Sequence, residues 1–278
     1  MTRRIPEPAL AVLREAGEVW VAPAERPLTP EELHAAVAGA DALVTLIPDR
    51  IDDAVLAAAG PSLRVVSTVA AGYDNLDVDA AARRGVVVTN TPGVLTEATA
   101  DLAMALILMT TRRLGEGERL VRAGRPWGWD LGFMLGTGLQ GATLGLVGFG
   151  RIARATARRA RAAGMEIRYT ARHRADPEAE GEAAAGHRPL EALLGESDVV
   201  SLHVPLTPET RHLIDAAALR RMRPGAHLVN TARGPIVDEA ALAEALTDGV
   251  IAGAGLDVFE DEPRVHPVSY THLTLPTN

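Results

Sequence analysis

The sequence contains no cysteine, which excludes disulfides, thiolate metal sites and a cysteine nucleophile. Lysine is also absent, so all 28 basic residues are arginine; they are outnumbered by 36 acidic residues. The resulting formal charge of −8 argues against nucleic acid as the main partner. The most apolar run, 102–109, is too short to cross a bilayer, and residues 1–10 do not have the pattern of a secretory signal. We therefore expect a cytoplasmic protein with no membrane partner.

Aromatic residues make up only 3% of the chain, but hydrophobic residues make up 47% and charged residues 23%, as in globular proteins with a sizeable core. Apolar runs alternate with alanine-rich helical patterns. The runs predict strands at 19–22, 42–46, 63–69, 86–89, 143–147, 165–170, 198–203, 226–229 and 251–257. Helices are expected at 30–38, 51–59, 78–84, 95–113, 151–163, 216–222 and 239–248, with an irregular connector over 115–139. This alternation predicts an α/β protein with two Rossmann- or flavodoxin-like parallel-sheet domains.

A glycine-rich turn follows the strand 143–147 and opens a helix, where residues 148–153 read Gly-Phe-Gly-Arg-Ile-Ala. In this pattern the first glycine permits a tight turn, the second lets the backbone approach a pyrophosphate, and the small third residue lets helix and strand pack closely. The helix start then offers unpaired N–H groups to the phosphates. The turn predicts dinucleotide binding by Gly148, Phe149, Gly150, Arg151 and Ile152.

The end of the next strand indicates which dinucleotide is preferred. NAD sites usually place a carboxylate there, about 20 residues after the glycines, to hold the ribose 2′-hydroxyl. Here the strand runs into Arg172, His173 and Arg174 instead. Guanidinium groups bind phosphate through paired hydrogen bonds, so these residues favour NADP(H) over NAD(H). The alternative is that they are solvated loop residues in an arginine-rich chain.

Three later segments occur in a fixed order: 197–210 reads Ser-Asp-Val-Val-Ser-Leu-His-Val-Pro-Leu-Thr-Pro-Glu-Thr, 229–234 reads Val-Asn-Thr-Ala-Arg-Gly, and 255–263 reads Gly-Leu-Asp-Val-Phe-Glu-Asp-Glu-Pro. With Gly-Tyr-Asp-Asn at 72–75 and Asn-Thr-Pro-Gly-Val at 90–94, the chain resembles the D-isomer-specific 2-hydroxyacid dehydrogenases up to about residue 267. Trp129, the region 132–136 and the Arg172/Arg174 pair most resemble the glyoxylate/hydroxypyruvate reductases of that family.

The resemblance implies an enzyme that transfers a hydride from NAD(P)H to a short 2-oxo acid, giving the D-2-hydroxy acid. It implies a substrate-binding domain over 1–92 and a dinucleotide-binding domain over 93–267. Arg233 matches the residue that holds the substrate, and Glu262 the carboxylate that orients a catalytic histidine. The backbone of Ala71 and Gly72 matches the loop that receives the substrate carboxylate. Further positions match the cofactor groove, namely Thr96, Pro205, Thr210, Thr231, Ala232 and Asp257; the neighbouring Glu260 and Asp261 are expected to be solvated.

The catalytic histidine of the family lies in a Pro-His-Ile-Gly-like stretch downstream of the glutamate, and the sequence contains no such stretch. His266 looks like the family's common non-catalytic His-Pro. Residues 268–278 contain no Ala, Gly or Arg, and they back-translate into a stretch that resembles a sequencing adapter. We therefore expect 268–278 to be a non-native tail, the substrate domain to be incomplete at both ends, and this chain to bind dinucleotide but turn over poorly.

Two alternative functions stay open from the sequence. One is another dehydrogenase of the same family, of the phosphoglycerate or 2-ketogluconate type. The other is a non-catalytic, dinucleotide-binding corepressor-like protein, which uses the same fold to bind partner peptides. Members of the family are commonly homodimers, and the apolar helix 95–113 is expected to be the contact.

Overall fold

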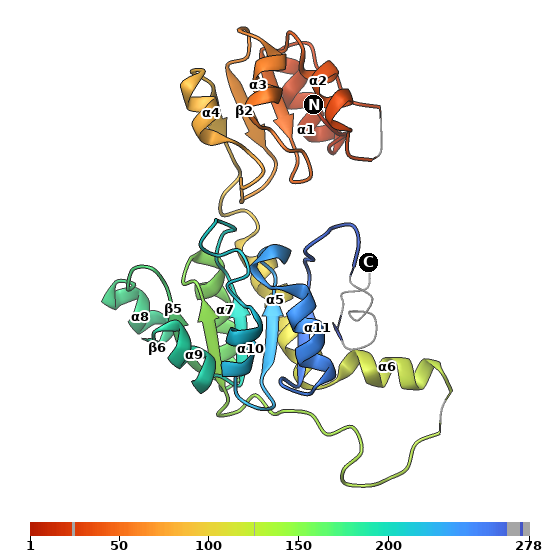
Figure 1. Ribbon diagram of the computed structural model, residues 1–278, viewed down its shortest axis with the longest axis vertical. Helices are drawn as coiled ribbons and strands as arrows, with labels where there is room; N and C mark the ends of the chain where they lie inside the picture. The colour runs from red at the N-terminus through yellow and green to blue at the C-terminus, as the bar shows by residue number, and fades with distance from the viewer. Residues whose placement is uncertain (24–25, 125, 266–272, 275–278) are drawn as a thin grey trace. The chain divides into compact units, whose positions relative to one another are not determined.

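The structure is a computed structural model that describes residues 1–23, 26–124, 126–265 and 273–274. The chain divides into two compact units, Met1–Leu95 (unit 1) and Thr96–Asn278 (unit 2). Each unit contains its own parallel sheet (Figure 1). No helix within the described ranges is long and apolar enough to span a membrane.

Unit 1 is built on a three-stranded sheet in the order β1-β2-β3. Its elements are α1 (Glu7–Ala16), α2 (Pro30–Val37), β1 (Ala42–Thr45), α3 (Asp53–Ala59), β2 (Val65–Thr68), α4 (Val78–Arg83) and β3 (Val87–Thr89). The side chains of Thr29, Asp52 and Asp77 accept backbone N–H groups at the starts of α2, α3 and α4. Such caps satisfy donors that a helix leaves unpaired, so these three helices begin where the sequence supplies a cap.

Unit 2 contains a seven-stranded parallel sheet in the order β10-β9-β8-β7-β4-β5-β6. Its strands are β4 (Thr143–Val147), β5 (Glu166–Thr170), β6 (Ala185–His187), β7 (Val199–Leu202), β8 (His227–Asn230), β9 (Gly253–Leu256) and β10 (Leu273–Thr274). The first strand of this sheet in the chain is β4. The next two strands, β5 and β6, extend the sheet on one side of β4, and β7 then pairs with β4 on the other side. The order therefore reverses between β4 and β7, where open α/β sheets bind their ligands.

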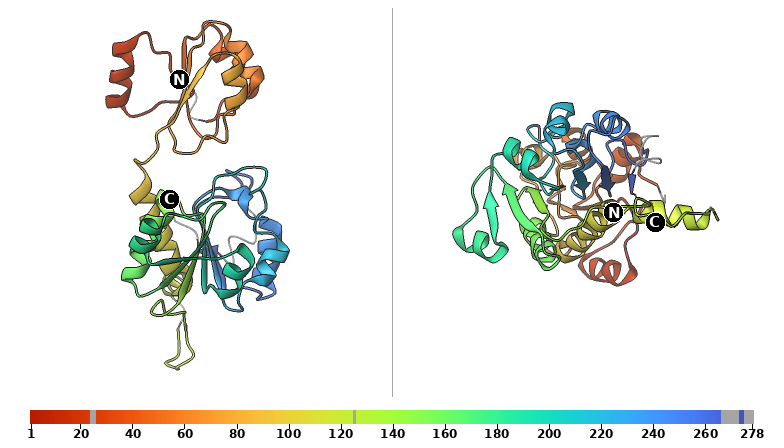
Figure 2. Two further views of the ribbon diagram at one scale, coloured as in Figure 1. Left: turned by 90° about the vertical axis from the view of Figure 1, so that its left-hand side faces the viewer. Right: turned by 90° about the horizontal axis from the view of Figure 1, so that it is seen from below.

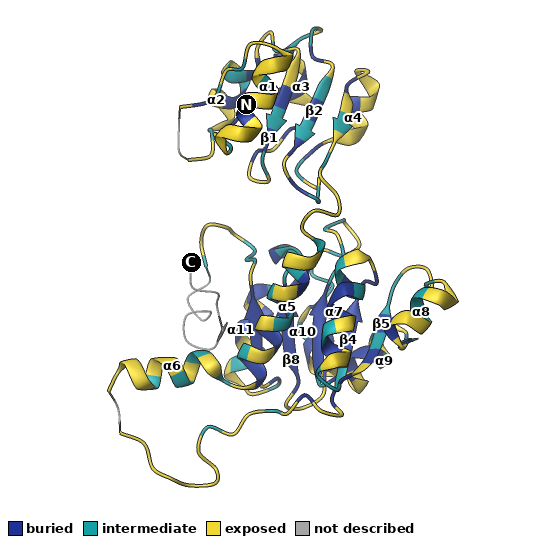
Figure 3. Cartoon of the chain, turned by 180° about the vertical axis from the view of Figure 1, so that it is seen from behind, coloured by how far each residue is buried: buried dark blue, intermediate teal, exposed yellow. Residues whose placement is uncertain are grey.

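Helices cover both faces of this sheet (Figure 2). They are α5 (Thr96–Thr111), α6 (Leu114–Arg122), α7 (Arg151–Ala162), α8 (Pro177–Ala183), α9 (Leu190–Glu196), α10 (Ala216–Arg221) and α11 (Glu239–Thr247), with a short 3₁₀ turn at Gly234–Ile236. One core joins α5 and α7 to the sheet, and a second joins α9, α10 and α11 to it. With both faces covered, every residue of β7, β8 and β9 is buried (Figure 3), as expected for a parallel sheet.

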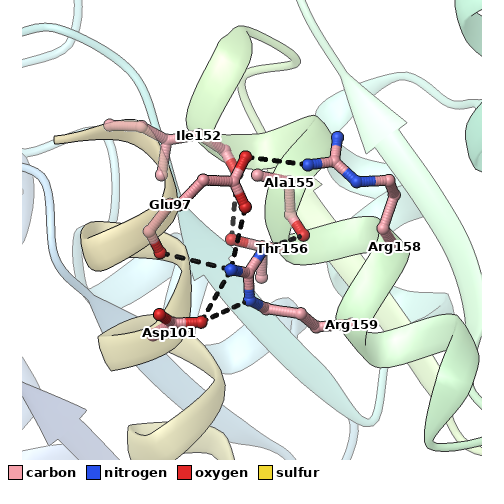
Figure 4. Close-up of polar contacts among 7 residues, drawn as sticks. All are labelled: Glu97, Asp101, Ile152, Ala155, Thr156, Arg158 and Arg159. Carbon is pink, nitrogen blue, oxygen red and sulfur yellow. Dashed lines mark hydrogen bonds and ion pairs between the residues drawn. The ribbon is translucent and has the colours of Figure 1, made fainter. Parts of the chain in front are cut away.

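The apolar side of helix α5, which we expected to form the contact of a homodimer, packs inside unit 2 instead. Ala100, Ala103, Leu106 and Ile107 are all fully buried. On its outer side, Arg159 of α7 lies 2.6 Å from the Asp101 carboxylate (Figure 4). Arg159 and its neighbour Arg158 each pair with Glu97 at 2.9 Å. These contacts fix α7, and with it the glycine turn from which α7 starts, against α5.

Some elements differ from the sequence-based expectation. Residues 19–22, all described, form no strand. Two hydrogen bonds join this segment to Met1, whose amino group donates to the Trp20 carbonyl and whose carbonyl accepts from the Ala22 amide. The connector expected over 115–139 begins with α6, an exposed helix with ion pairs Arg113–Glu116 and Arg122–Glu118. Sequence reading missed it because its glycines lower helix propensity and it buries no residue. The short elements α8, β6 and α9 were also missed, as was the ten-residue helix α1, in which only Leu10 is buried.

A buried histidine ties the sheet to the end of α5. The ring of His227 in β8 lies 3.2 Å from Thr110 Oγ1 and 3.4 Å from Thr137 Oγ1. The residue is 4% exposed, and desolvation lowers its pKa from 6.5 to about 4. The native protein therefore keeps this ring neutral in a pH range in which the unfolded chain takes up a proton.

We expect the free energy of unfolding to fall as pH drops from about 6.5 toward 4, because over that range the unfolded state binds more protons than the native state. His227→Gln should lower the number of protons taken up on unfolding in this pH range by about one, which makes the free energy of unfolding less dependent on pH. Urea unfolding at pH 7 and pH 5 measures the difference. The matched control is His173→Gln at an exposed position, and an unchanged slope in H227Q would contradict the assignment.

Candidate active site

The predicted phosphate-binding turn lies at the point where the strand order of unit 2 reverses. Gly148 adopts φ +95°, and its amide donates to the Thr170 carbonyl at 2.9 Å. A Cβ at Gly148 would lie 2.6 Å from the His203 carbonyl oxygen, so only glycine fits between β5 and β7. Gly150, by contrast, is exposed and has open space where a Cβ would be. The turn is thus tightly packed against the sheet at Gly148, and its backbone is open to solvent at Gly150.

The start of α7 fits an anionic ligand. Gly150 is its N-cap and no side chain caps the helix, so the first N–H groups and the positive end of the helix dipole stay available to phosphate. Ala153 is fully buried at the helix–strand contact, as the motif requires. Arg151 is exposed and Ile152 half-buried. Within the described ranges, no cluster of three or more possible metal ligands occurs.

Phe149 points into the protein rather than toward the open side of the turn. Its ring stacks on Tyr169 with the centroids 4.0 Å apart, and only 9% of the residue is exposed. Any contact that Phe149 makes with a dinucleotide therefore comes from its backbone. The side chain instead joins the turn to β5.

The loop after β5 carries the three residues expected to select the cofactor. Arg172, His173 and Arg174 are all exposed. Arg174 makes a two-bond ion pair with Glu180 of α8, with Nε and one terminal nitrogen each 2.9 Å from a carboxylate oxygen. The sequence has no carboxylate directly after this strand. The fold nevertheless brings the carboxylate of Glu180, which lies eight residues after Arg172, to the loop.

The segments after β7 and β8 reach the same edge of the sheet. The Thr210 hydroxyl donates to the Pro205 carbonyl at 2.7 Å and accepts from the Thr207 amide, closing the loop after β7. After β8, Thr231, Ala232 and Arg233 are half-buried. The Asn230 side chain spans this turn: it donates to the Arg233 carbonyl and accepts from the Ala232 amide. The backbone that presents the Arg233 guanidinium is therefore braced from below.

The segment after β9 carries Asp257 and Glu262. Burial, and then the Glu262 charge, raise the pKa of Asp257, so the two carboxylates lie close enough to interact. Glu262 accepts a hydrogen bond from the Phe259 amide at 2.8 Å. Glu262 is exposed in this structure, and the hydrogen bond from the Phe259 amide holds its side chain against its own loop.

Glu260, expected to be solvated, is instead part of a network. Its carboxylate lies 2.7 Å from His212 Nε2 and 3.1 Å from an Arg211 nitrogen, and its backbone amide donates to Glu239. The expectation was wrong because it treated an acidic turn in isolation. The fold places the loop after β7 beside the loop after β9, so a histidine and an arginine meet this carboxylate.

The remaining candidates lie at strand and helix ends. Ala71 and Gly72 follow β2 of unit 1, where the Asn90 side chain donates to the Ala71 carbonyl at 2.8 Å. Thr96 is the first residue of α5 in unit 2. His266 and the greater part of the predicted tail 268–278 lie outside the described residues; residues 273–274 pair with β9 as β10.

The predicted residues of unit 2 thus come from five chain segments to one edge of one sheet. They comprise a glycine turn under the N-terminus of α7, arginines after β5, the loop after β7 that Thr210 closes, a cation after β8 and two carboxylates after β9. Such an edge defines a dinucleotide-binding α/β protein of the Rossmann class. Sequence reading missed Tyr169, Glu180, His212 and Arg211, since a residue that acts through another side chain leaves no local motif.

Comparisons with known proteins agree with this class. The family model "D-isomer specific 2-hydroxyacid dehydrogenase, NAD binding domain" matches residues 104–276. A glyoxylate reductase of Thermococcus kodakarensis is 52% identical over 267 residues, which cover 95% of this chain and 80% of that protein. Among solved structures, the TT0316 protein of Thermus thermophilus matches with a TM-score of 0.88 and 45% identity, over 99% of this chain and 86% of that chain. A glyoxylate reductase from Paecilomyes thermophila matches with a TM-score of 0.89 and 34% identity, over 99% and 85%.

The chain belongs to the D-isomer-specific 2-hydroxyacid dehydrogenase family. It is a nicotinamide-dependent oxidoreductase that acts on small 2-oxo acids. The family and the α/β fold predicted from the sequence are confirmed.

Proposed function

We propose that this protein reduces glyoxylate or hydroxypyruvate to the D-2-hydroxy acid, with NADPH preferred over NADH. The position of Arg233 carries the proposal: it follows β8, two strands from the glycine turn, on the sheet edge to which the turn belongs. The relatives named glyoxylate reductase, about half identical over most of their length, support the choice of substrate. The phosphoglycerate and 2-ketogluconate alternatives and the corepressor alternative have no comparable support.

The chemistry can be divided among the chain's residues. Bound NAD(P)H supplies the hydride. The Arg233 guanidinium binds the carboxylate and carbonyl oxygens of the 2-oxo acid together, which orients the carbonyl carbon for attack. The backbone of Ala71 and Gly72 receives the substrate carboxylate, and Asp257 contacts the nicotinamide carboxamide. Glu262 is placed to orient the histidine that protonates the forming alkoxide in this family, but the sequence contains no stretch that matches this histidine.

The domain assignment is also part of the proposal: residues 93–267 form the dinucleotide-binding domain, and residues 1–92 form the substrate-binding domain. The remaining cofactor contacts come from Arg151, Ile152, Thr96, Pro205, Thr210, Thr231 and Ala232, several of them through backbone atoms. The cytoplasmic location also stays a prediction.

A substrate panel tests the reaction. Oxidation of NADPH is followed with glyoxylate, hydroxypyruvate, phosphohydroxypyruvate and 2-ketogluconate, at equal concentrations of protein. We expect glyoxylate and hydroxypyruvate to give the highest kcat/KM, with low absolute turnover. A preference for either of the other two acids overturns the proposal, and ordinary turnover with glyoxylate contradicts the expectation that the proton donor is missing.

Arg172 is the residue on which the NADPH preference depends most. It is exposed at the end of β5, and an arginine–phosphate contact is worth about 1.5–3 kcal/mol. We expect Arg172→Ala to weaken NADPH binding by about tenfold or more, and NADH binding less than twofold. Calorimetric titration of both nucleotides measures this. Arg151→Ala, an exposed arginine at the helix start, should weaken both nucleotides alike; equal losses in R172A would contradict the assignment.

We also propose a homodimer, with a different contact from the one expected in α5. Large apolar side chains are exposed on α6 and the loop that follows it: Val121 is 66%, Trp129 99% and Leu131 97% exposed. Exposed apolar groups of this kind mark interaction surfaces. Sedimentation velocity over a range of protein concentrations tests the proposal, and a monomer at all concentrations would overturn it.

A further inference from the structure

The carboxylate of Glu180 occupies the centre of a small network beneath the loop that follows β5. One of its oxygens accepts hydrogen bonds from the Tyr169 hydroxyl at 2.6 Å and from Arg174 Nε at 2.9 Å. The other oxygen accepts from a terminal nitrogen of Arg174, also at 2.9 Å. The Glu180 side chain is only 14% exposed, whereas Arg174 is 70% exposed. The carboxylate is thus covered by the arginine it binds.

Tyr169 fixes this network relative to the phosphate turn. Its ring is fully buried, stacks on Phe149 of the turn at 4.0 Å, and meets the edge of His187 at 5.2 Å. Its hydroxyl also accepts from the Ala175 amide at 2.8 Å, so it braces the loop directly. A chain of contacts therefore runs from the turn, through Tyr169, to Glu180. These contacts hold the Glu180 carboxylate in a fixed position beside the loop.

Glu180 is ionised at every working pH. The hydrogen bond from Arg174, followed by that from Tyr169, lowers the pKa of Glu180 from 4.5 to about 2. Arg174 and Glu180 together carry no net charge, so this arginine offers a 2′-phosphate much less attraction than a lone guanidinium does. A 2′-hydroxyl is neutral, so its binding is affected little by the loss of net positive charge at Arg174.

We propose that Glu180 determines cofactor selectivity by opposing the 2′-phosphate, and that it keeps the preference for NADPH over NADH modest. The inference rests on the proposed function, in which the loop 172–174 receives the 2′-phosphate. Arg172 then provides the positive charge of the site. Arg174 is held by its Nε edge, and its remaining N–H groups act as hydrogen-bond donors whose charge is offset. Two forces compete when Glu180 is neutralised: the dianionic phosphate gains attraction, and Arg174 loses part of its fixed orientation.

The gain in attraction is the larger effect. A phosphate carries nearly two charges, and the whole of the repulsion from Glu180 disappears in a Glu180→Gln variant. The loss of orientation is partial, because the glutamine amide oxygen still accepts a hydrogen bond from Arg174 or from Tyr169. The sign of the effect is therefore set by charge, and it should shrink at high salt.

Binding of two nucleotide fragments isolates this effect. Adenosine 2′,5′-bisphosphate and 5′-AMP differ only in the 2′-phosphate, and calorimetry measures the affinity of each without any need for turnover. We expect Glu180→Gln to tighten binding of the bisphosphate by about fivefold at low salt and by less at high salt. Binding of 5′-AMP should change by less than about twofold. The NADPH-to-NADH affinity ratio should rise by the same factor.

Two controls separate this role from simpler ones. Glu178→Gln removes a negative charge from an exposed position on the same helix, and it should leave the affinity ratio unchanged within about twofold. Tyr169→Phe removes the hydrogen bond to Glu180 and the acceptor of the Ala175 amide, but it keeps the Glu180 carboxylate and its two hydrogen bonds from Arg174. The affinity ratio should therefore change much less than in E180Q. Thermal unfolding of each variant checks that it is folded.

The outcomes distinguish this inference from the proposed function. Weaker binding of the bisphosphate in E180Q overturns the inference, because Glu180 would then support the phosphate contact by orienting Arg174. No change in E180Q, together with a loss in R172A, also overturns it and leaves the NADPH preference standing. If the unmodified chain binds the bisphosphate no better than 5′-AMP, and R172A has no effect, the NADPH preference itself fails.

Discussion

Replacing Gly150 with alanine is expected to weaken dinucleotide binding by about tenfold or more, because a methyl group then stands where the pyrophosphate approaches the backbone. The folded structure of the protein should change little. A Cβ at this position meets no atom within 4 Å, and φ of −77° suits any residue. The cost to stability should be about 1 kcal/mol or less, the usual difference between glycine and alanine at an N-cap.

The neighbouring glycine provides the contrast. Gly148→Ala puts a methyl carbon 2.6 Å from the His203 carbonyl oxygen, at a φ of +95°. This variant should lose both nucleotide affinity and several kcal/mol of unfolding free energy, since the clash is with backbone atoms. Calorimetric titration with NADPH and urea unfolding measure the two quantities. Wild-type affinity in G150A would show that the pyrophosphate does not lie on this turn.

Arg233→Ala is expected to weaken binding of a 2-oxo acid by at least about fiftyfold, equivalent to about 2–3 kcal/mol for the lost charge-assisted hydrogen bonds. Oxamate, an unreactive analogue of short 2-oxo acids, makes the measurement independent of turnover. Its binding to the NADPH-loaded protein can be followed by the nucleotide's fluorescence. Arg233→Lys should recover part of the affinity, because an ammonium group keeps the charge and loses the two-pronged geometry.

The matched control for this variant is Arg211→Ala. Arg211 is also an arginine on the carboxyl side of the sheet, and its side chain lies 3.1 Å from the Glu260 carboxylate. Its loss should leave oxamate binding within about twofold of the original value. Equal losses in R233A and R211A would mean that only the general positive charge of the region matters, and they would contradict the role given to Arg233.

Much of unit 2 could be predicted from the sequence. Apolar runs of strand length between helical patterns gave β4, α7, β5, β7, β8 and β9 close to their observed bounds. In a parallel α/β sheet the carboxyl ends of the strands share one edge, so motifs directly after strands had to gather there. The family resemblance assigned Gly148 and Arg233 to one active site, and the two residues follow β4 and β8 of the same sheet.

Partners of individual side chains could not be predicted in the same way. The glycine motif predicts the backbone path at residues 148–150 but not that the Phe149 ring turns inward onto Tyr169. The sequence predicts Glu260 and Asp261 to be solvated, although the fold brings His212 Nε2 to 2.7 Å from the Glu260 carboxylate. Helix α6, none of whose residues is buried, contains two glycines, which lower helix propensity.

The sequence by itself determined the class of this protein, because backbone-level requirements such as a glycine at positive φ, a cap before a helix or a small residue at a helix–strand contact are local and are written directly in residue order. The tertiary structure alone decided which charges meet. The pairing of Arg174 with Glu180, and thereby the charge that a 2′-phosphate would encounter, depends on α8 folding back under the loop after β5. Electrostatic energy depends on distances in space, and those distances exist only once the sheet and its helices have packed.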